Sequence, residues 1–362
     1  EAILSSMTEG VLAVNNQESV ITANQAASDI LGLDAKPIIG KKLGAVIRNA
    51  GLQDLLADAL ACTTPVEGET TIYDHTERIV KMRAATLQTE DGARLGAVVV
   101  LNDITQLRKL EQMRRDFVAN VSHELRTPIT TIQGFLETLL EGALDDKKDA
   151  ERFLRIIQKQ TTRLNAIIED LLLLSRIEKE EENEAPLAVE PCQLRDVLKG
   201  TVEACRQMAA KKGIGVELQC PQDLTADVNP VLLQQAVTNL LRNAVTYSET
   251  EKPVDIIALE QAGECRISVR DYGRGIPPQH LPRLFERFYR VDRARSRERG
   301  GTGLGLAIVK HIVHDHGGTV TVDSTVGEGS VFTIHIPHKH PRRTRRKKQA
   351  PPENNDRRTR GR

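Results

Sequence analysis

A histidine with an acidic neighbour lies inside a long helical stretch of the sequence. In the run His123-Glu124-Leu125-Arg126-Thr127-Pro128, His123 and Thr127 are four residues apart, so on a helix they share one face. Glu124 can take the proton from one ring nitrogen of the histidine, which makes the other nitrogen more nucleophilic. The arrangement supports phosphorylation of a histidine nitrogen, and a surface histidine with chance neighbours is the alternative.

Two asparagines lie one turn apart on a second predicted helix, residues 229–246. Asn239 and Asn243 share one face, while apolar residues fill the opposite side. Amide oxygens on one ridge suit a hydrated Mg²⁺ ion and the phosphates of a nucleotide. Paired asparagines also occur on helices without any function, and this alternative stays open.

A carboxylate and two glycines follow the predicted strand 264–270. Asp271 can accept a hydrogen bond from an exocyclic amine such as that of adenine. Gly273 and Gly275 permit a close approach of the backbone. An ordinary turn at the end of a strand is the alternative.

A second glycine-rich run, from Gly300 to Leu306, leads directly into the predicted helix 304–316. Backbone N–H groups at a helix N-terminus bind phosphate, although this run is neither a Walker A nor a Gly-x-Gly-x-x-Gly sequence. An arginine-rich loop precedes it and predicts a cationic lid, with a solvated charge run as the alternative. The arginines of this loop are Arg293, Arg295, Arg297 and Arg299.

Short strands and long helices precede these motifs. Residues 1–103 show strand signals at 10–14, 20–23, 79–85 and 95–101 and one short helix at 26–33, which predicts an α+β domain. Residues 104–140 and 147–182 then predict two long amphipathic helices joined by a short loop. Apolar residues on the second helix recur at alternating spacings of three and four. One hairpin cannot bury the apolar faces of both helices, so we expect two hairpins to pair as a four-helix bundle in a homodimer.

Helix and strand signals alternate over residues 192–337, after an acidic, proline-containing linker at 183–191. This alternation predicts an α/β sandwich with helices on one face of a mixed sheet. The expected helices are 194–211, 229–246 and 304–316, and the expected strands are 214–219, 254–260, 264–270, 319–323 and 330–336.

Composition limits the class of protein. Hydrophobic residues make up 40% of the 362 residues, enough for a core, but no apolar stretch is long enough for a membrane helix. Residues 338–362 carry a net charge of +9 and residues 1–337 a net charge of −9. A basic tail on an acidic body does not predict a nucleic-acid-binding fold, so we expect a disordered tail and no nucleic-acid partner.

The order and spacing of these motifs make residues 104–337 resemble the sensor histidine kinases of two-component systems. The boxes that carry the resemblance are the H box (His123 to Pro128), the N box (Asn239 to Tyr247), the G1 box (Asp271 to Gly275), the F box (Phe285 to Phe288) and the G2 box (Gly301 to Gly305). The resemblance implies a dimerisation and histidine-phosphotransfer hairpin at 104–182, and an ATP-binding domain of the Bergerat type at 192–337.

Residues 1–103 resemble a PAS domain. The resemblance rests on the Glu-Gly-Val-Leu-Ala-Val opening and the Asn-Asp-Ile-Thr exit before the first long helix. The whole resembles the cytoplasmic half of a phosphate-regulon-type sensor kinase. Because the sequence begins at Glu1 without a signal peptide, we expect a piece of a longer protein whose membrane attachment, in the inner membrane, comes from an upstream segment.

The resemblance implies a role for each matching residue of the H box. His123 would be the phosphoacceptor, Glu124 the base in autophosphorylation, and Thr127 an aid in dephosphorylating the partner. The implied activity is ATP-dependent phosphorylation of His123, followed by transfer to an aspartate of a response regulator and by dephosphorylation of that regulator. A non-enzymatic, ATP-gated scaffold and nucleic-acid binding through the tail are the rival hypotheses.

The resemblance also implies the ATP site. Asn243 would hold Mg²⁺, Asn239 would lie at the phosphates, Asp271 would bind adenine, and Arg290 would contact the γ-phosphate. The other residues expected at ATP are Tyr247, Gly273, Gly275, Gly301, Thr302, Gly303, Leu304 and Gly305.

Two positions depart from the family pattern. Thr246 stands where the family usually has a basic residue near the phosphates, and Tyr272 replaces the common asparagine of the G1 box. The first departure would weaken ATP binding, and we expect the arginine-rich lid to compensate.

Overall fold

The computed structural model divides into two compact units, Glu1–Ala119 and Asn120–Arg362. Helix α5 (Thr105–Thr138) begins in the first unit and ends in the second. The arginines of the expected lid and the basic tail lie outside the described residues. The described residues are 4, 6–33, 38–62, 64–73, 76–182, 187–249, 252–292 and 301–337.

The first unit is built on a five-stranded antiparallel sheet in the order β2-β1-β5-β4-β3. The predicted strands and the first helix of this unit are confirmed, whereas β3, α3 and α4 were not predicted. The strands are β1 (Gly10–Asn15), β2 (Val20–Ala23), β3 (Val66–Tyr73), β4 (Glu77–Gln88) and β5 (Arg94–Asp103). The helices are α2 (Gln25–Leu31), α3 (Leu43–Val46) and α4 (Ala50–Ala61).

Helix α4 and the sheet enclose the core of the first unit. Leu52 and Leu56 lie on the buried face of α4 and belong to the same apolar cluster as Met82 and Leu101 of the sheet. Asn49 caps the helix, because its side-chain oxygen accepts a hydrogen bond of 2.9 Å from the backbone of Leu52. Burial of each such side chain stabilises the unit by about 1.5–3 kcal/mol.

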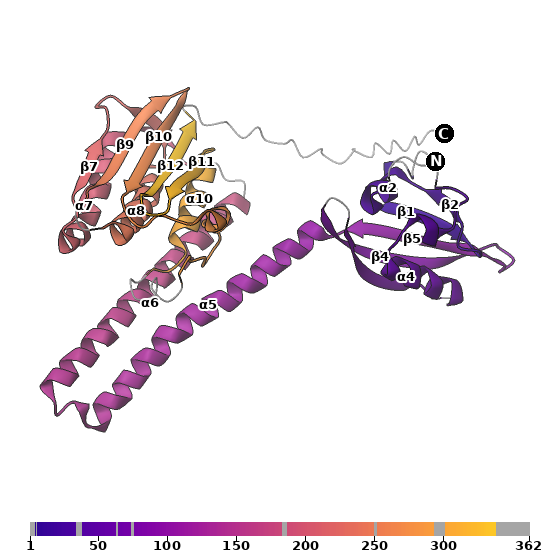
Figure 1. Ribbon diagram of the computed structural model, residues 1–362, viewed down its shortest axis with the longest axis horizontal. Helices are drawn as coiled ribbons and strands as arrows, with labels where there is room; N and C mark the ends of the chain where they lie inside the picture. Colours follow the sequence, from indigo (N-terminus) through magenta and orange to yellow (C-terminus); the bar gives the residue numbers. More distant parts are fainter. Residues whose placement is uncertain are drawn as a thin grey trace, which may run out of the picture. The chain divides into compact units, whose positions relative to one another are not determined.

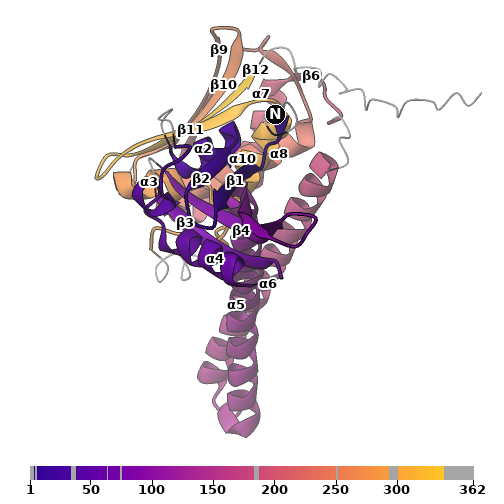
Figure 2. The same ribbon diagram turned by 90° about the vertical axis from the view of Figure 1, so that its right-hand side faces the viewer.

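The predicted helical hairpin is confirmed. One turn of π-helix (Leu139–Ala143) ends α5, and α6 (Lys147–Glu182) runs back beside it, as Figure 2 shows. Gly142 takes a φ of 129° in the connection, where a side chain would be strained. The rings of Phe135 and Phe153 pack across the hairpin with centroids 5.1 Å apart.

Several large apolar side chains of the hairpin are exposed in the single chain. On α6, Leu154, Ile168 and Leu172 are 52%, 41% and 55% exposed. On α5, Ile129 and Leu136 are 42% and 44% exposed. An apolar surface of this kind is typical of an interface.

The rest of the second unit has two layers (Figure 1). Its five-stranded sheet has the order β11-β12-β10-β9-β7, in which β7 and β9 pair parallel and the other pairs are antiparallel. The predicted sandwich is therefore confirmed. The strands are β7 (Val216–Gln219), β9 (Val254–Gln261), β10 (Glu264–Asp271), β11 (Thr319–Thr325) and β12 (Gly329–Pro337).

The helices α7 (Leu194–Lys212), α8 (Pro230–Tyr247) and α10 (Gly305–Asp315) form the second layer. Leu240 and Leu241 of α8 share a fully buried core with Ile256, Ile267 and Ile308. A two-stranded sheet of β6 (Glu190–Gln193) and β8 (Thr225–Val228) was not predicted, and β6 begins inside the expected linker. A 3₁₀ turn (Pro278–Arg283) follows β10.

Candidate active site

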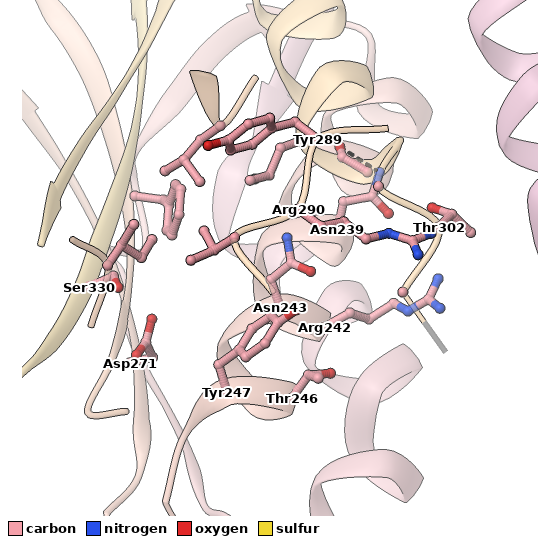
Figure 3. Close-up of a pocket in the computed structure, with 18 of the residues that line it drawn as sticks. Asn239, Arg242, Asn243, Thr246, Tyr247, Asp271, Tyr289, Arg290, Thr302 and Ser330 are labelled. Carbon is pink, nitrogen blue, oxygen red and sulfur yellow. Dashed lines mark hydrogen bonds between the residues drawn. The ribbon is translucent and has the colours of Figure 1, made fainter. Parts of the chain in front are cut away.

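A cavity of about 220 Å³ lies between the helices and the sheet of the second unit. Figure 3 shows Asp271 and Ser330 at one end of it, Arg242, Arg290 and Thr302 at the other, and Asn243 between them. The residues expected at ATP that line it are Asn239, Asn243, Tyr247, Asp271, Gly275, Arg290, Gly301, Thr302, Gly303 and Gly305. Gly273 and Leu304 adjoin this lining along the chain.

Helix α8 carries the asparagines of the cavity. Asn229 caps its N-terminus by accepting a hydrogen bond of 3.1 Å from the backbone of Leu232. The backbone N–H of Asn229 in turn donates to Nε2 of His316 over 2.9 Å, which ties this end of α8 to the end of α10. The side chain of Asn239 is buried and donates to the carbonyl oxygen of Gly305 over 3.4 Å. Asn239 therefore links α8 to the glycine-rich loop, and Asn243 faces the cavity one turn further along the helix.

Asp271 ends strand β10 and is 5% exposed. Its Oδ1 accepts a hydrogen bond of 3.0 Å from the backbone of Gly273. Burial raises the pKa of the Asp271 carboxyl, and hydrogen bonds from Gly273 and Ser330 partly offset the rise. A side chain at Gly273 would collide with the carbonyl oxygen of Tyr247, so the close approach predicted for this glycine is confirmed.

The glycine-rich loop before α10 packs against the segment that contains the F box. The backbone N–H of Phe288 donates to the carbonyl oxygen of Gly303 over 2.8 Å. Gly303 has a φ of +78°, and a Cβ atom there would lie 2.9 Å from the Cα atom of Phe288. Thr302 Oγ1 accepts a hydrogen bond of 3.2 Å from the backbone of Leu304. These contacts fix the loop at the end of the cavity where Arg290 and Thr302 lie, which is the end expected to bind phosphates.

The H box meets the same region through Glu124. Its Oε2 accepts hydrogen bonds from Arg163 of α6 over 2.7 Å and from Arg290 over 3.1 Å. Both arginine side chains are almost fully buried, at 7% and 5% exposure. The adjacent His123 is exposed, and Thr127 donates from Oγ1 to the carbonyl oxygen of His123 over 3.0 Å.

Helix α6 also reaches the cavity directly. Asp170 lines it and accepts a hydrogen bond of 2.7 Å from Thr302 Oγ1. Burial raises the pKa of the Asp170 carboxyl, while Thr302 and the charge of Arg242 lower it. Hairpin and sandwich therefore share one set of polar contacts.

Sequence reasoning missed four residues of this arrangement: Asp170, Arg163, Arg242 and Ser330. Arg242 was detectable, because it lies three residues after Asn239 and four before Thr246 on one helical face. The other three come from distant elements, and no local pattern marks them. Tyr272 lies outside the cavity lining and donates to Asp255 over 2.8 Å, so its departure from the family pattern does not touch the site.

Three family comparisons match successive parts of the chain. Residues 1–104 match the PAS fold, residues 113–180 the His Kinase A (phospho-acceptor) domain, and residues 228–340 the histidine kinase-, DNA gyrase B- and HSP90-like ATPases. The sensor protein kinase WalK of Staphylococcus epidermidis is 34% identical over 342 residues, covering 93% of this chain and 54% of WalK. The chain belongs to the sensor histidine kinases.

Two further proteins are similar to this sensor histidine kinase. The sensor histidine kinase WalK of Bacillus subtilis is 33% identical over 344 residues, 93% of this chain and 55% of that protein. The histidine kinase ThkA, solved in complex with the response regulator protein TrrA, shares the fold with a TM-score of 0.50 at 22% identity, covering 95% of this chain and 99% of ThkA.

The kinase chain spans about half the length of the curated relatives that it matches. In the described residues, no helix is long and apolar enough to cross a membrane. The membrane location expected for the full-length protein stays a prediction.

Proposed function

We propose that this sensor histidine kinase transfers the γ-phosphoryl group of ATP to His123 and then to an aspartate of a response regulator. The observation that carries the proposal is the placement of the cavity. Residues suited to adenine and phosphates line it, and the helix with His123 and Glu124 contacts its border through Arg290. The ATPase family match supports the use of ATP.

The first step is a displacement at phosphorus. A ring nitrogen of His123 forms the new N–P bond, the bond between the γ-phosphorus and the β,γ-bridging oxygen breaks, and ADP leaves. Glu124 takes the proton of the other ring nitrogen. Both arginines hold Oε2 of this carboxylate, so Oε1 is the oxygen we assign to the proton.

The donor set of the cavity fits Mg²⁺. The ion prefers oxygen ligands and is commonly bound by one or two protein groups together with substrate phosphates. Asn243 presents an amide between the two ends of the cavity, where the phosphate chain of a nucleotide would begin. Bound there, Mg²⁺ would neutralise charge on the transferred phosphoryl group.

Partners and domain roles belong to the same proposal. The exposed apolar residues of the hairpin favour a homodimer through a four-helix bundle. A response regulator as the phosphoryl acceptor agrees with ThkA, which was solved with one.

We assign sensing to residues 1–103, dimerisation and phosphotransfer to 104–182, and ATP binding to 192–337, with 183–191 as the linker and 338–362 as a basic tail. Thr127 would assist dephosphorylation of the regulator.

The test is incubation of the 362-residue chain with Mg²⁺ and γ-labelled ATP. We expect acid-labile, alkali-stable label on the protein, and none on the His123→Ala variant. His314→Ala is the matched control, because His314 is also an exposed histidine on a helix, and it should label normally. Full labelling of His123→Ala would exclude this histidine as the acceptor.

A further inference from the structure

The phosphate end of the cavity contains an arginine to which the proposed function gives no role. Arg242 lies on the face of α8 that also carries Asn239 and Thr246, and all three line the cavity. It is the one basic residue of α8. Its side chain is exposed, and it donates no hydrogen bond to any residue that the structure describes.

The other two arginines of the cavity lining are placed differently. Arg290 is ion-paired with Glu124 of the hairpin. Arg274 lies over the ring of Tyr247, with its guanidinium carbon 5.6 Å from the ring centroid. Arg242 thus combines an exposed guanidinium with a position at the end of the cavity where Thr302 lies (Figure 3).

A carboxylate of the hairpin lies at this same end. Asp170 lines the cavity, accepts the hydrogen bond of Thr302, and interacts favourably with the charge of Arg242. A hydroxyl donor and a guanidinium also form a suitable site for a phosphate oxygen. The carboxylate of Asp170 therefore lies among groups that would serve the phosphate chain of a nucleotide.

We propose that Arg242 binds the phosphate chain of ATP, and that Asp170 is the anion that competes with the phosphates for Arg242 and Thr302. The proposal rests on the proposed function, because it concerns how the same cavity binds ATP. Arg242 supplies the cation that Thr246, one turn further along the same helix face, does not supply. The phosphates of the incoming nucleotide repel Asp170 and weaken its contact with Thr302, so ATP binding loosens this contact between hairpin and sandwich.

The test measures direct binding of a non-hydrolysable ATP analogue and of adenosine to the full chain. We expect Arg242→Gln to weaken binding of the ATP analogue by about 10- to 100-fold, which is the usual range for a lost charged hydrogen bond. Adenosine has no phosphates, so its affinity should not change. Arg206→Gln is the control, because Arg206 is an exposed arginine of α7 outside the cavity lining, and it should bind both ligands normally.

The competing carboxylate has its own variant. Asp170→Asn keeps the shape of the side chain but removes the charge that repels phosphate, so we expect the ATP analogue to bind more tightly, on the order of fivefold. In the double variant with Arg242→Gln this gain should shrink, because the two side chains act on one ligand group.

Two results would overturn the inference. Equal losses for the ATP analogue and adenosine in Arg242→Gln would mean that Arg242 supports the fold and not the phosphates. Unchanged affinity for the analogue would remove Arg242 from the site altogether. Neither outcome depends on phosphotransfer, so failure of the inference is distinguishable from failure of the proposed function, which the labelling of His123 tests separately.

Discussion

The two ends of the cavity hold their carboxylates in different ways. At one end, Asp271 is fixed by the backbone of its own loop and by Ser330 of the neighbouring strand. At the other end, Asp170 and Glu124 come from the hairpin and bind Thr302 and Arg290 of the sandwich. Burial raises the pKa of both aspartates, yet only Asp170 depends on contact between the two substructures.

This difference separates a permanent part of the site from an exchangeable one. The contacts of Asp271 persist as long as the sheet of the sandwich is folded, which suits a group that recognises one base. The contacts of Asp170 and Glu124 exist only while the hairpin lies against the sandwich. Under the proposed function, the helix with His123 presents this histidine first to ATP and later to another protein, so it has to change its contacts. The two carboxylates lie at the contacts that this change would break.

The largest expected effect concerns Glu124, at the end of the cavity that the hairpin contacts. It is an effect mainly on the rate of phosphorylation and not on the binding of ATP. Glu124→Gln removes the proposed base, so we expect the rate of His123 labelling to fall by about 10²–10⁴-fold. Because Glu124 does not itself line the cavity, the affinity for ATP should change much less than the labelling rate. Rapid-quench labelling and equilibrium binding of an ATP analogue measure the two quantities.

Glu137→Gln is the matched control for this variant. Glu137 is an exposed glutamate on the same helix, so its labelling rate should be normal. A normal rate in Glu124→Gln would contradict the base and leave the ion pairs with Arg163 and Arg290 as the only role of Glu124.

The second-largest expected effect concerns Asp271, at the opposite end of the cavity, and it is an effect on nucleotide binding. Asp271→Ala removes the buried carboxylate that we expect to accept a hydrogen bond from the adenine amine, so adenosine and ATP should both bind about 10- to 100-fold more weakly. Asp255→Ala removes a carboxylate of the adjacent strand that pairs with Tyr272 outside the cavity lining, and should bind both ligands normally. A loss confined to ATP would mean that Asp271 acts at the phosphates, and the contrast between the two ends would disappear.

The sequence predicted the parts of the site that are local in the chain. Asn239 and Asn243 are one helical turn apart, and the G2 glycines directly precede α10, so local spacing indicated both. Gly273 was predicted for its close approach, and the backbone of Tyr247 is what it approaches. In such cases the chemistry and the local fold depend on the same few residues.

Contacts across the fold could not be predicted in this way. Asp170 reaches Thr302 over 132 positions of sequence, and Glu124 reaches Arg290 over 166. Each pairing depends on how α6 and α5 lie against the sandwich, which no local pattern states. Helix α4 is a different case, because its capping Asn49 and its buried leucines at helical spacing were visible in the sequence but were not recognised.

The smallest expected effect is a dependence of stability on pH that distinguishes the two aspartates. Burial raises the pKa of Asp170 above its ordinary value of 3.8, so the folded protein keeps this proton to higher pH than the unfolded chain. As pH rises from that ordinary value through the raised one, the folded state binds more protons and the free energy of unfolding falls. Asp170→Asn lacks this contribution, so it should lose less stability than the wild type over that range in denaturant unfolding. The contribution of Asp271 has the same sign and stays in both proteins, which makes them a matched pair. Equal pH slopes would show that Asp170 is as well solvated in the folded state as in the unfolded chain.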